Sequence, residues 1–160
     1  MSQTTYNRVA PDGFAGLLAD SGENRIVSRA LEEAAAVDFG KPFVAGTDKE
    51  VQVLLPSAAD QDFQGVSVHR HNEKTRFTGA AAAQPDENLD ILRGGRIFVE
   101  VEVDVVAGDA VAFRFTDNGP LLAGGWTNVT DAETQDISTI ARWDKGALAG
   151  EVAVLVLNLP

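Results

Sequence analysis

The sequence predicts an all-β protein, a small antiparallel β-barrel or sandwich that follows an N-terminal arm. From residue 37 onward, short β-branched and alternating runs are separated by turns rich in Gly, Pro, Asn and Asp. No long helical pattern lies between these runs, and many short strands in succession are typical of barrels and sandwiches. One domain is expected for 160 residues, and we divide the chain into a leader, residues 1–36, and a barrel domain, residues 37–160.

The leader differs in composition from the rest of the chain. Residues 1–12 are polar and predict a flexible tail, whereas residues 13–22 are apolar but interrupted by glycines. Residues 24–36 favour a helix by propensity and by the spacing of their apolar side chains, and Asp20 begins a capping-box-like sequence. The leader therefore predicts one short helix at about 23–36, with an extended arm that orders on a partner as the alternative.

The expected strands follow from alternation and from turn residues at their ends. They are residues 51–55 before Pro56, then 65–69, 89–93, 96–104, 111–115 and the closing run 152–157. Gly94 and Gly95 lie between two alternating runs and predict a hairpin. The closing run is apolar throughout, which suits a central strand that is covered on both faces.

Alternation also assigns faces to two of these strands. One face of the run 96–104 is expected to be buried, namely Ile97, Val99, Val101 and Val103. The other face is expected to meet water, namely Phe98, Glu100, Glu102 and Asp104. In the run 111–115 the expected inward side chains are Val111, Phe113 and Phe115, with Arg114 outward. Residues 78–88 and 118–136 are expected to be long loops.

The composition excludes several kinds of site. The chain has no cysteine, which rules out a disulfide, a thiolate metal site, an iron–sulfur cluster and a cysteine nucleophile. The formal net charge is −11 and the 13 Lys and Arg residues are scattered, so we expect no nucleic-acid partner. No apolar stretch approaches the roughly 18 residues of a membrane-spanning helix, and no signal peptide is apparent, so we expect no membrane partner.

His69 and His71 are the two histidines of the chain. Residues two apart on a strand share a face, so both rings could reach one metal ion, and with Gly65, Glu73 and Gly79 the stretch resembles the cupin metal motif. The spacings differ from that motif, and it would need a third histidine. We therefore expect an exposed strand end with no metal and no other cofactor, and a cupin-like metal-binding β-barrel enzyme stays open as an alternative.

We assign no catalytic residues and expect no enzyme activity. Glu100 and Glu102 share one face of a strand, an arrangement more typical of a solvated surface than of paired carboxylates in a cleft. The serines lie in no nucleophile-elbow sequence, and neither Gly94-Gly95 nor Gly124-Gly125 begins a phosphate-binding loop.

The two tryptophans have different expected roles. Trp143 is expected in the core. Trp126 follows two glycines in a long loop, so it is either a core residue or an exposed interface anchor. A displayed receptor- or glycan-binding module that uses this loop is a second alternative function.

Several stretches, in order along the chain, resemble the structural cement, or capsid decoration, family of tailed phages. They are residues 13–22, 27–33, 39–40, 55–59, 65–68, 92–99, 108–111 and 150–157. Together they cover nearly the whole chain. The resemblance implies a virion structural protein, made in the host cytoplasm, that decorates and cements the outside of an icosahedral head.

Such a protein binds where subunits of the major capsid protein meet, and it is commonly a homotrimer. Cementing needs contact area rather than an active site, and we expect the leader to supply the contact. The expected interface residues are the apolar anchors Phe14, Leu17 and Leu18, the charged residues Arg25, Arg29, Glu32 and Glu33, and Trp126.

Overall fold

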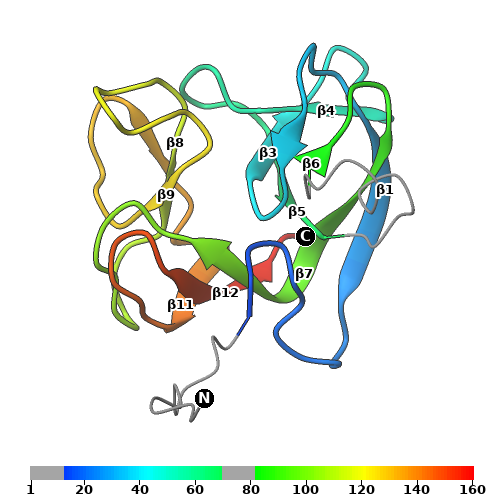
Figure 1. Ribbon diagram of the computed structural model, residues 1–160. Helices are drawn as coiled ribbons and strands as arrows, with labels where there is room; N and C mark the ends of the chain where they lie inside the picture. The colour runs from blue at the N-terminus through cyan, green and yellow to red at the C-terminus, as the bar shows by residue number, and fades with distance from the viewer. Residues whose placement is uncertain (1–12, 70–81) are drawn as a thin grey trace, which may run out of the picture.

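The computed structural model describes residues 13–69 and 82–160 (Figure 1). Within these ranges the regular elements are all β-strands, so the predicted all-β class is confirmed. None of the described segments forms a helix that is long and apolar enough to cross a membrane.

The described strands are short, apart from three. They are β1 (Arg25–Leu31), β2 (Val37–Asp38), β3 (Pro42–Ala45), β4 (Gln52–Leu54), β5 (Phe63–Ser67), β6 (Ala82–Ala83), β7 (Asn88–Glu100), β8 (Ala112–Arg114), β9 (Trp126–Thr127), β10 (Thr134–Asp136), β11 (Ala141–Lys145) and β12 (Val152–Asn158). β12 lies between β7 and β11, which confirms the central position that its apolar sequence predicts.

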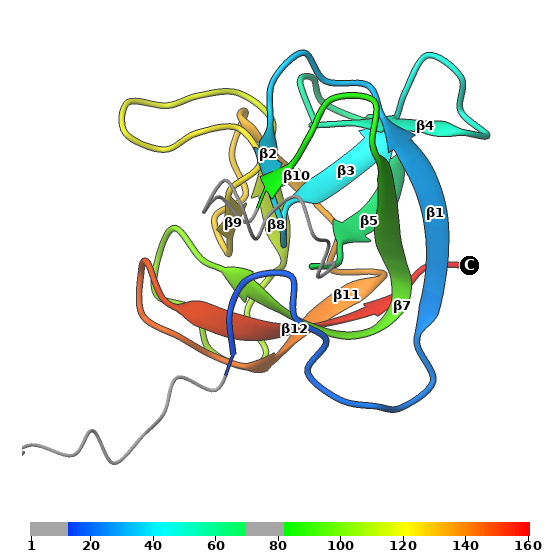
Figure 2. The same ribbon diagram turned by 45° about the vertical axis from the view of Figure 1, so that its right-hand side comes forward.

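Five strands close into a barrel. The main sheet has the order β1-β4-β3-β5-β7-β12-β11, and an additional pairing of β1 with β7 closes the ring (Figure 1, Figure 2). Neighbouring strands are antiparallel except for the short parallel pair of β1 with β4. β12 and β11 continue the sheet beyond the ring, while β10, β8 and β9 form a separate three-stranded sheet.

The long strand β7 connects the barrel to the rest of the molecule. Its first part pairs with β1 and β5, and its second part pairs with β12. The predicted hairpin at Gly94 and Gly95 is therefore wrong, because both glycines lie inside one continuous strand. Gly95 has a φ of 131°, and a Cβ atom there would collide with the Asn24 side chain, so close approach of the leader explains the glycine.

The predicted helix at about 23–36 is also wrong. Residues 25–31 form β1, which pairs with β7 over most of its length and with β4 at its end. Leu31 is fully buried inside the barrel and Val27 packs against the same cluster. The apolar spacing allowed a helix, but pairing with distant strands decided the conformation, and this part of the leader belongs to the barrel sheet.

Two hydrophobic clusters form the core. The smaller one fills the five-stranded ring and includes Phe43, Leu89 and Ile91. The larger one lies where β7, β12, β11 and the three-stranded sheet meet, and it contains both tryptophans. Trp143 is buried as predicted. The segment 118–136, expected to be one long loop, contains β9 and β10.

Candidate functional site

The leader is held along one edge of β7. The Gly16 amide donates to the Phe98 carbonyl at 2.8 Å, the Phe98 amide donates to the Leu17 carbonyl at 2.9 Å, and the Ala19 amide donates to the Arg96 carbonyl at 2.9 Å. Phe98, expected on a wet face, is buried, and a Cβ atom at Gly13 would touch its ring. The leader therefore covers the strand edge opposite β12 and the apolar side chain beside it.

This arrangement separates the three predicted apolar anchors. Phe14 is 48% exposed and Leu17 is 36% exposed, whereas Leu18 packs against the larger core cluster. The Phe14 ring meets the His69 ring edge-on, with centroids 4.8 Å apart, and Phe39 contacts the same imidazole at 5.0 Å. Phe14 and Leu17 are thus available to a partner on a segment whose backbone is already fixed.

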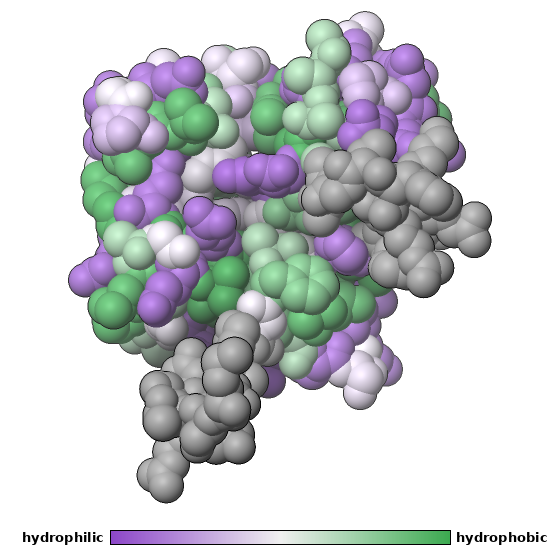
Figure 3. Space-filling model, in the orientation of Figure 1, coloured by the Kyte–Doolittle hydropathy of each residue, from purple (hydrophilic) through white to green (hydrophobic). Residues whose placement is uncertain are grey.

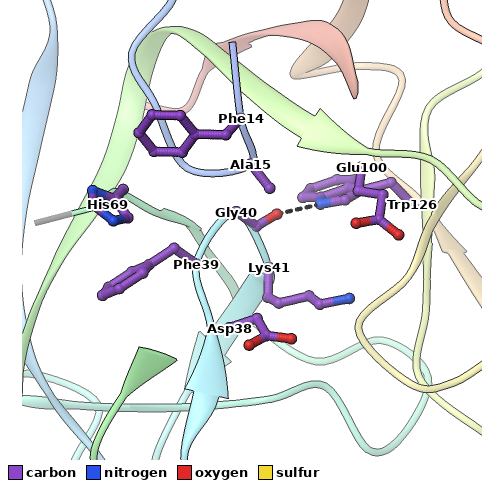
Figure 4. Close-up of a pocket in the computed structure, with 9 residues that line it drawn as sticks. All are labelled: Phe14, Ala15, Asp38, Phe39, Gly40, Lys41, His69, Glu100 and Trp126. Atoms are coloured by element: carbon purple, nitrogen blue, oxygen red, sulfur yellow. Dashed lines mark hydrogen bonds between the residues drawn. The ribbon is translucent and has the colours of Figure 1, made fainter. Parts of the chain in front are cut away.

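Phe14 is one of the residues that line a cleft of about 300 Å³ (Figure 4). The cleft is lined by Phe14, Ala15, Asp38, Phe39, Gly40, Lys41, His69, Glu100 and Trp126. The indole N–H of Trp126 donates to the Gly40 carbonyl at 2.7 Å. Trp126 is only 1% exposed, so it is a core residue beneath the cleft and its expected role as an exposed anchor is not supported.

A second cleft, of about 290 Å³, meets the first one at Lys41 and Glu100, which line both. Its other lining residues are Val101, Glu102, Pro120, Leu121, Leu122, Gly125 and Gly150. We call the two clefts together the Lys41 groove. Leu122 lines only the second cleft and is 63% exposed, so each cleft has an exposed apolar side chain in its lining.

A buried ion pair lies beneath the groove. The Arg114 Nε lies 3.1 Å from the Glu102 carboxylate, and its Nη1 lies 3.3 Å from the Glu133 carboxylate. The side chain of Arg114 is 3% exposed and that of Glu102 is 9% exposed, so the predictions of an outward Arg114 and a solvated Glu102 are wrong. Burial raises the pKa of Glu102, and the nearby charges of Arg114 and Lys41 partly offset this effect.

The remaining acidic groups of the groove are solvent-exposed. Asp38 and Glu100 are both exposed, the latter as predicted, and neither forms an ion pair with a residue that the structure describes. The described lining residues combine one lysine and three carboxylates with apolar side chains, an arrangement that can bind a charged partner group.

The four predicted charged contacts of the leader all bind their own chain. Arg25 donates to the Asn158 side chain at 3.2 Å and to the Leu159 carbonyl. Arg29 donates to the Ser28 carbonyl at 3.2 Å. Glu33 accepts from the Leu55 amide at 2.8 Å.

Glu32 accepts two hydrogen bonds from Thr47, from the amide and the hydroxyl, each at 2.6 Å. These hydrogen bonds lower the pKa of Glu32. Arg25, Glu32 and Glu33 therefore tie β1 and the residues after it to distant segments, whereas the bond of Arg29 stays within β1.

The predicted histidine pair lies partly outside the described residues, because these end at His69 and resume at residue 82. Within the described ranges no cluster of three His, Cys, Asp or Glu side chains could hold a metal ion. Sequence reasoning missed Lys41, Asp38 and Leu122, since the segment 38–41 and the loop at Leu122 are far apart in the sequence and come together only in the fold. Leu121 and Leu122 directly follow the turn at Gly119-Pro120, and this pattern could have predicted an apolar side chain exposed in a loop.

A family model described as "Structural cement protein (E217 gp24/Pam3 gp6)" matches residues 2–158. A search of curated proteins found no match. Among solved structures, a chain of the capsid of Myoviridae phage XM1 superposes with a TM-score of 0.75, with 14% sequence identity over 99% of this chain and 97% of that chain. At this identity the structural likeness supports the fold alone.

Proposed function

The chain belongs to the phage structural cement protein family, and from this premise we propose that it binds the outer surface of an assembled icosahedral head where major capsid subunits meet. In this role it would hold neighbouring subunits together as a homotrimer on the virion, after synthesis in the host cytoplasm. The observation that carries the proposal is the family match, which spans nearly the whole chain.

The physical properties of the chain suit this role. A stable protein–protein interface buries about 1,200–2,000 Å² in total and needs no catalytic group. A trimer that engages several subunits at once gains avidity beyond each single contact. The net charge of −11 would favour attachment to a basic partner surface.

We place the contact with the capsid on the exposed side chains of the leader. Phe14 and Leu17 project from a segment that three backbone hydrogen bonds hold against β7, so little conformational entropy is lost when they bind. Leu18 would contribute indirectly by anchoring the segment in the core. The charged residues of the leader already form hydrogen bonds within the chain. A contact of Arg25, Arg29, Glu32 or Glu33 with the capsid would have to form in addition to these bonds.

The test is to mix the purified protein with mature heads that lack it, and to measure binding and head disruption on heating. We expect saturable binding and heads that resist heat or chelator better. A Phe14→Ser/Leu17→Ser variant should bind more weakly, whereas Val51→Ser, which alters an apolar side chain 53% exposed on another loop, should bind normally. Absence of saturable binding by the wild-type protein would contradict the proposal.

The alternatives have less support. Display of a glycan-binding loop would use Trp126 as its aromatic contact, and that side chain is buried. Metal analysis of the purified protein, with and without His69→Ala and His71→Ala, would separate a cupin-like protein from a cement protein.

A further inference from the structure

We propose that the Lys41 groove binds a segment of the major capsid protein in which a Lys or Arg side chain lies between apolar residues. This inference rests on the proposed function and adds to it the chemistry of the capsid segment. Three features of the groove carry it: an exposed apolar side chain in each cleft, its uncompensated carboxylates and the fixed positions of its walls.

Each of the two clefts has an exposed apolar side chain, and the residues they share are charged. Phe14 lines the first cleft and is 48% exposed, and Leu122 lines the second and is 63% exposed. Lys41 and Glu100 lie where the two clefts meet. On the face shown in Figure 3, hydrophilic residues lie directly beside hydrophobic patches. A matching segment therefore has apolar side chains on both sides of a polar one.

The charges in the middle favour a cation. The carboxylates of Asp38, Glu100 and Glu102 line the groove. Arg114 pairs with Glu102 from below, and Lys41 also stabilises the charge on Glu102. Arg114 also pairs with Glu133, so its charge is shared between two carboxylates. Asp38 and Glu100 are left without an ion pair among the described residues. A Lys or Arg side chain of the partner would find an uncompensated carboxylate here.

The walls of the groove are held in place before binding. The indole of Trp126 is fixed by its bond to the Gly40 carbonyl, which Figure 4 shows as a dashed line in the same view as Lys41 and Glu100. Gly125 packs so closely on Glu102 that a Cβ atom would collide with the carboxylate. A preformed site loses little entropy on binding, which favours a specific peptide segment.

A capsid segment suits the groove better than a second copy of this chain. The unpaired carboxylates of the groove require a cation, and a copy of this chain carries 24 Asp and Glu residues against 13 Lys and Arg, so the contacts of the expected trimer lie elsewhere on the surface. We therefore commit to the capsid protein as the occupant.

The test uses charge reversal on heads that lack the protein. Glu100→Lys and Asp38→Lys should each weaken saturable binding by about tenfold, because they replace an attraction with a repulsion. Glu50→Lys is the matched control, since Glu50 is an exposed carboxylate outside the groove, and it should bind within about twofold of wild type. Added salt should weaken wild-type binding more than that of Glu100→Gln. Thermal unfolding should verify that each variant is folded.

The outcomes separate this inference from the proposed function. Equal binding by wild type and Glu100→Lys would overturn the inference alone, whereas no binding by wild type would contradict the proposed function and the inference with it. A change in oligomeric state on Glu100→Lys, without heads, would show that a second copy fills the groove and would also overturn the inference.

A photo-crosslinking amino acid at Leu122 provides an independent readout on the assembled particle. We expect crosslinks to a capsid peptide that contains Lys or Arg next to apolar residues. Crosslinks to a peptide without a basic residue, or to this chain itself, would overturn the inference.

Discussion

Arg114 and Glu102 form an ion pair that is almost fully excluded from water. Two charges in such a place are stable only together, because each compensates the cost of desolvating the other. The pair connects β8 to the residues after β7, directly beneath the Lys41 groove. Single residues here therefore affect both the stability of the fold and the shape of the binding surface.

Removal of one partner from this pair should destabilise the fold strongly. We expect Arg114→Met to lower the free energy of unfolding by about 3 kcal/mol, because it leaves a buried carboxylate unpaired. The double variant Arg114→Met/Glu102→Met should recover most of this loss. Denaturant unfolding of wild type, the two single variants and the double variant would measure the coupling. Additive effects of the two substitutions would contradict a coupled pair.

The carboxylates of Asp109 and Asp136 should give the fold an acid-sensitive component. Hydrogen bonds from Val106 and Asn128 to Asp109, and from Ser138 to Asp136, lower the pKa of each carboxyl below its ordinary value of 3.8. The unfolded state therefore binds more protons than the folded state in this pH range. The stabilisation is fully present above the pKa of the unfolded state and is lost as the pH falls through the pKa of the folded state.

We expect the free energy of unfolding to fall between about pH 5 and about pH 2. An Asp109→Asn/Asp136→Asn variant should lose less stability over the same range, as measured by denaturant unfolding at each pH. Glu102 makes a contribution of the opposite sign to this pH dependence. Because its pKa is raised in the folded state, the folded state binds a proton more readily than the unfolded state, and stability falls as the pH rises past the ordinary pKa of 4.5. Identical pH profiles of the variant and wild type would contradict the assignment to the two aspartates.

At the scale of elements, β7 is the strand that connects the barrel, the remaining sheet and the leader. It belongs to the barrel at one end, to the β12–β11 extension at the other, and it carries the leader on its edge. Its two central glycines allow the leader to approach the strand closely at the point where its pairing partner changes.

Gly95→Ala tests this close approach. The substitution introduces a side chain at a φ of 131° and against Asn24, so we expect a loss of about 1–3 kcal/mol in the free energy of unfolding. Gly108→Ala is the control, since Gly108 also has a positive φ but has open space around it, and it should cost less. Equal losses at the two positions would assign the effect to backbone strain alone.

Truncation of the leader at two points separates attachment from folding. Removal of residues 1–36 deletes β1 and with it Leu31 of the barrel core, so this protein should show no cooperative unfolding. Removal of residues 1–19 keeps every described strand but exposes Phe98 and the β7 edge, so it should fold with lower stability and fail to attach to heads. Near-UV circular dichroism and thermal unfolding would distinguish the two, and cooperative unfolding after removal of residues 1–36 would contradict the role of β1.

At the scale of the whole molecule, we expect a homotrimer in solution. Native mass spectrometry should give three times the monomer mass of 17.0 kDa. The fraction of trimer should rise with moderate salt, because salt screens the repulsion between copies that each carry a charge of −11. A monomer at all salt concentrations would contradict the expected trimer and would leave cementing without avidity.

Strands whose signals lie in neighbouring residues were predicted well from the sequence. The strands around 51–55, 111–115 and 152–157 are present, because alternation and turn residues act within a few positions of each other. Phe14, Leu17 and Leu18 were expected to anchor the capsid contact; the first two are exposed and Leu18 packs against the core, and their role in attachment stays a prediction.

Patterns whose outcome depends on distant residues were predicted poorly. Residues 25–31 have a spacing that suits either a helix or a strand, and the presence of β7 and β4 decided between them. Arg114 was expected outside by alternation, yet Glu102 and Glu133 provide partners that make its burial possible. The Lys41 groove was not predicted at all, since residues 38–41, the end of β7 and the loop at Leu122 meet only in the folded molecule.

The sequence by itself determined the all-β class, the absence of thiol chemistry, the acidic character and the resemblance to the cement family. These properties depend on composition and on the order of local patterns, which folding does not change. The tertiary structure decided that β1 is a strand, that Gly94 and Gly95 continue β7, and that Trp126 is buried. Each of these depends on burial and hydrogen bonding with partners far along the chain, and such partners become neighbours only when the barrel closes.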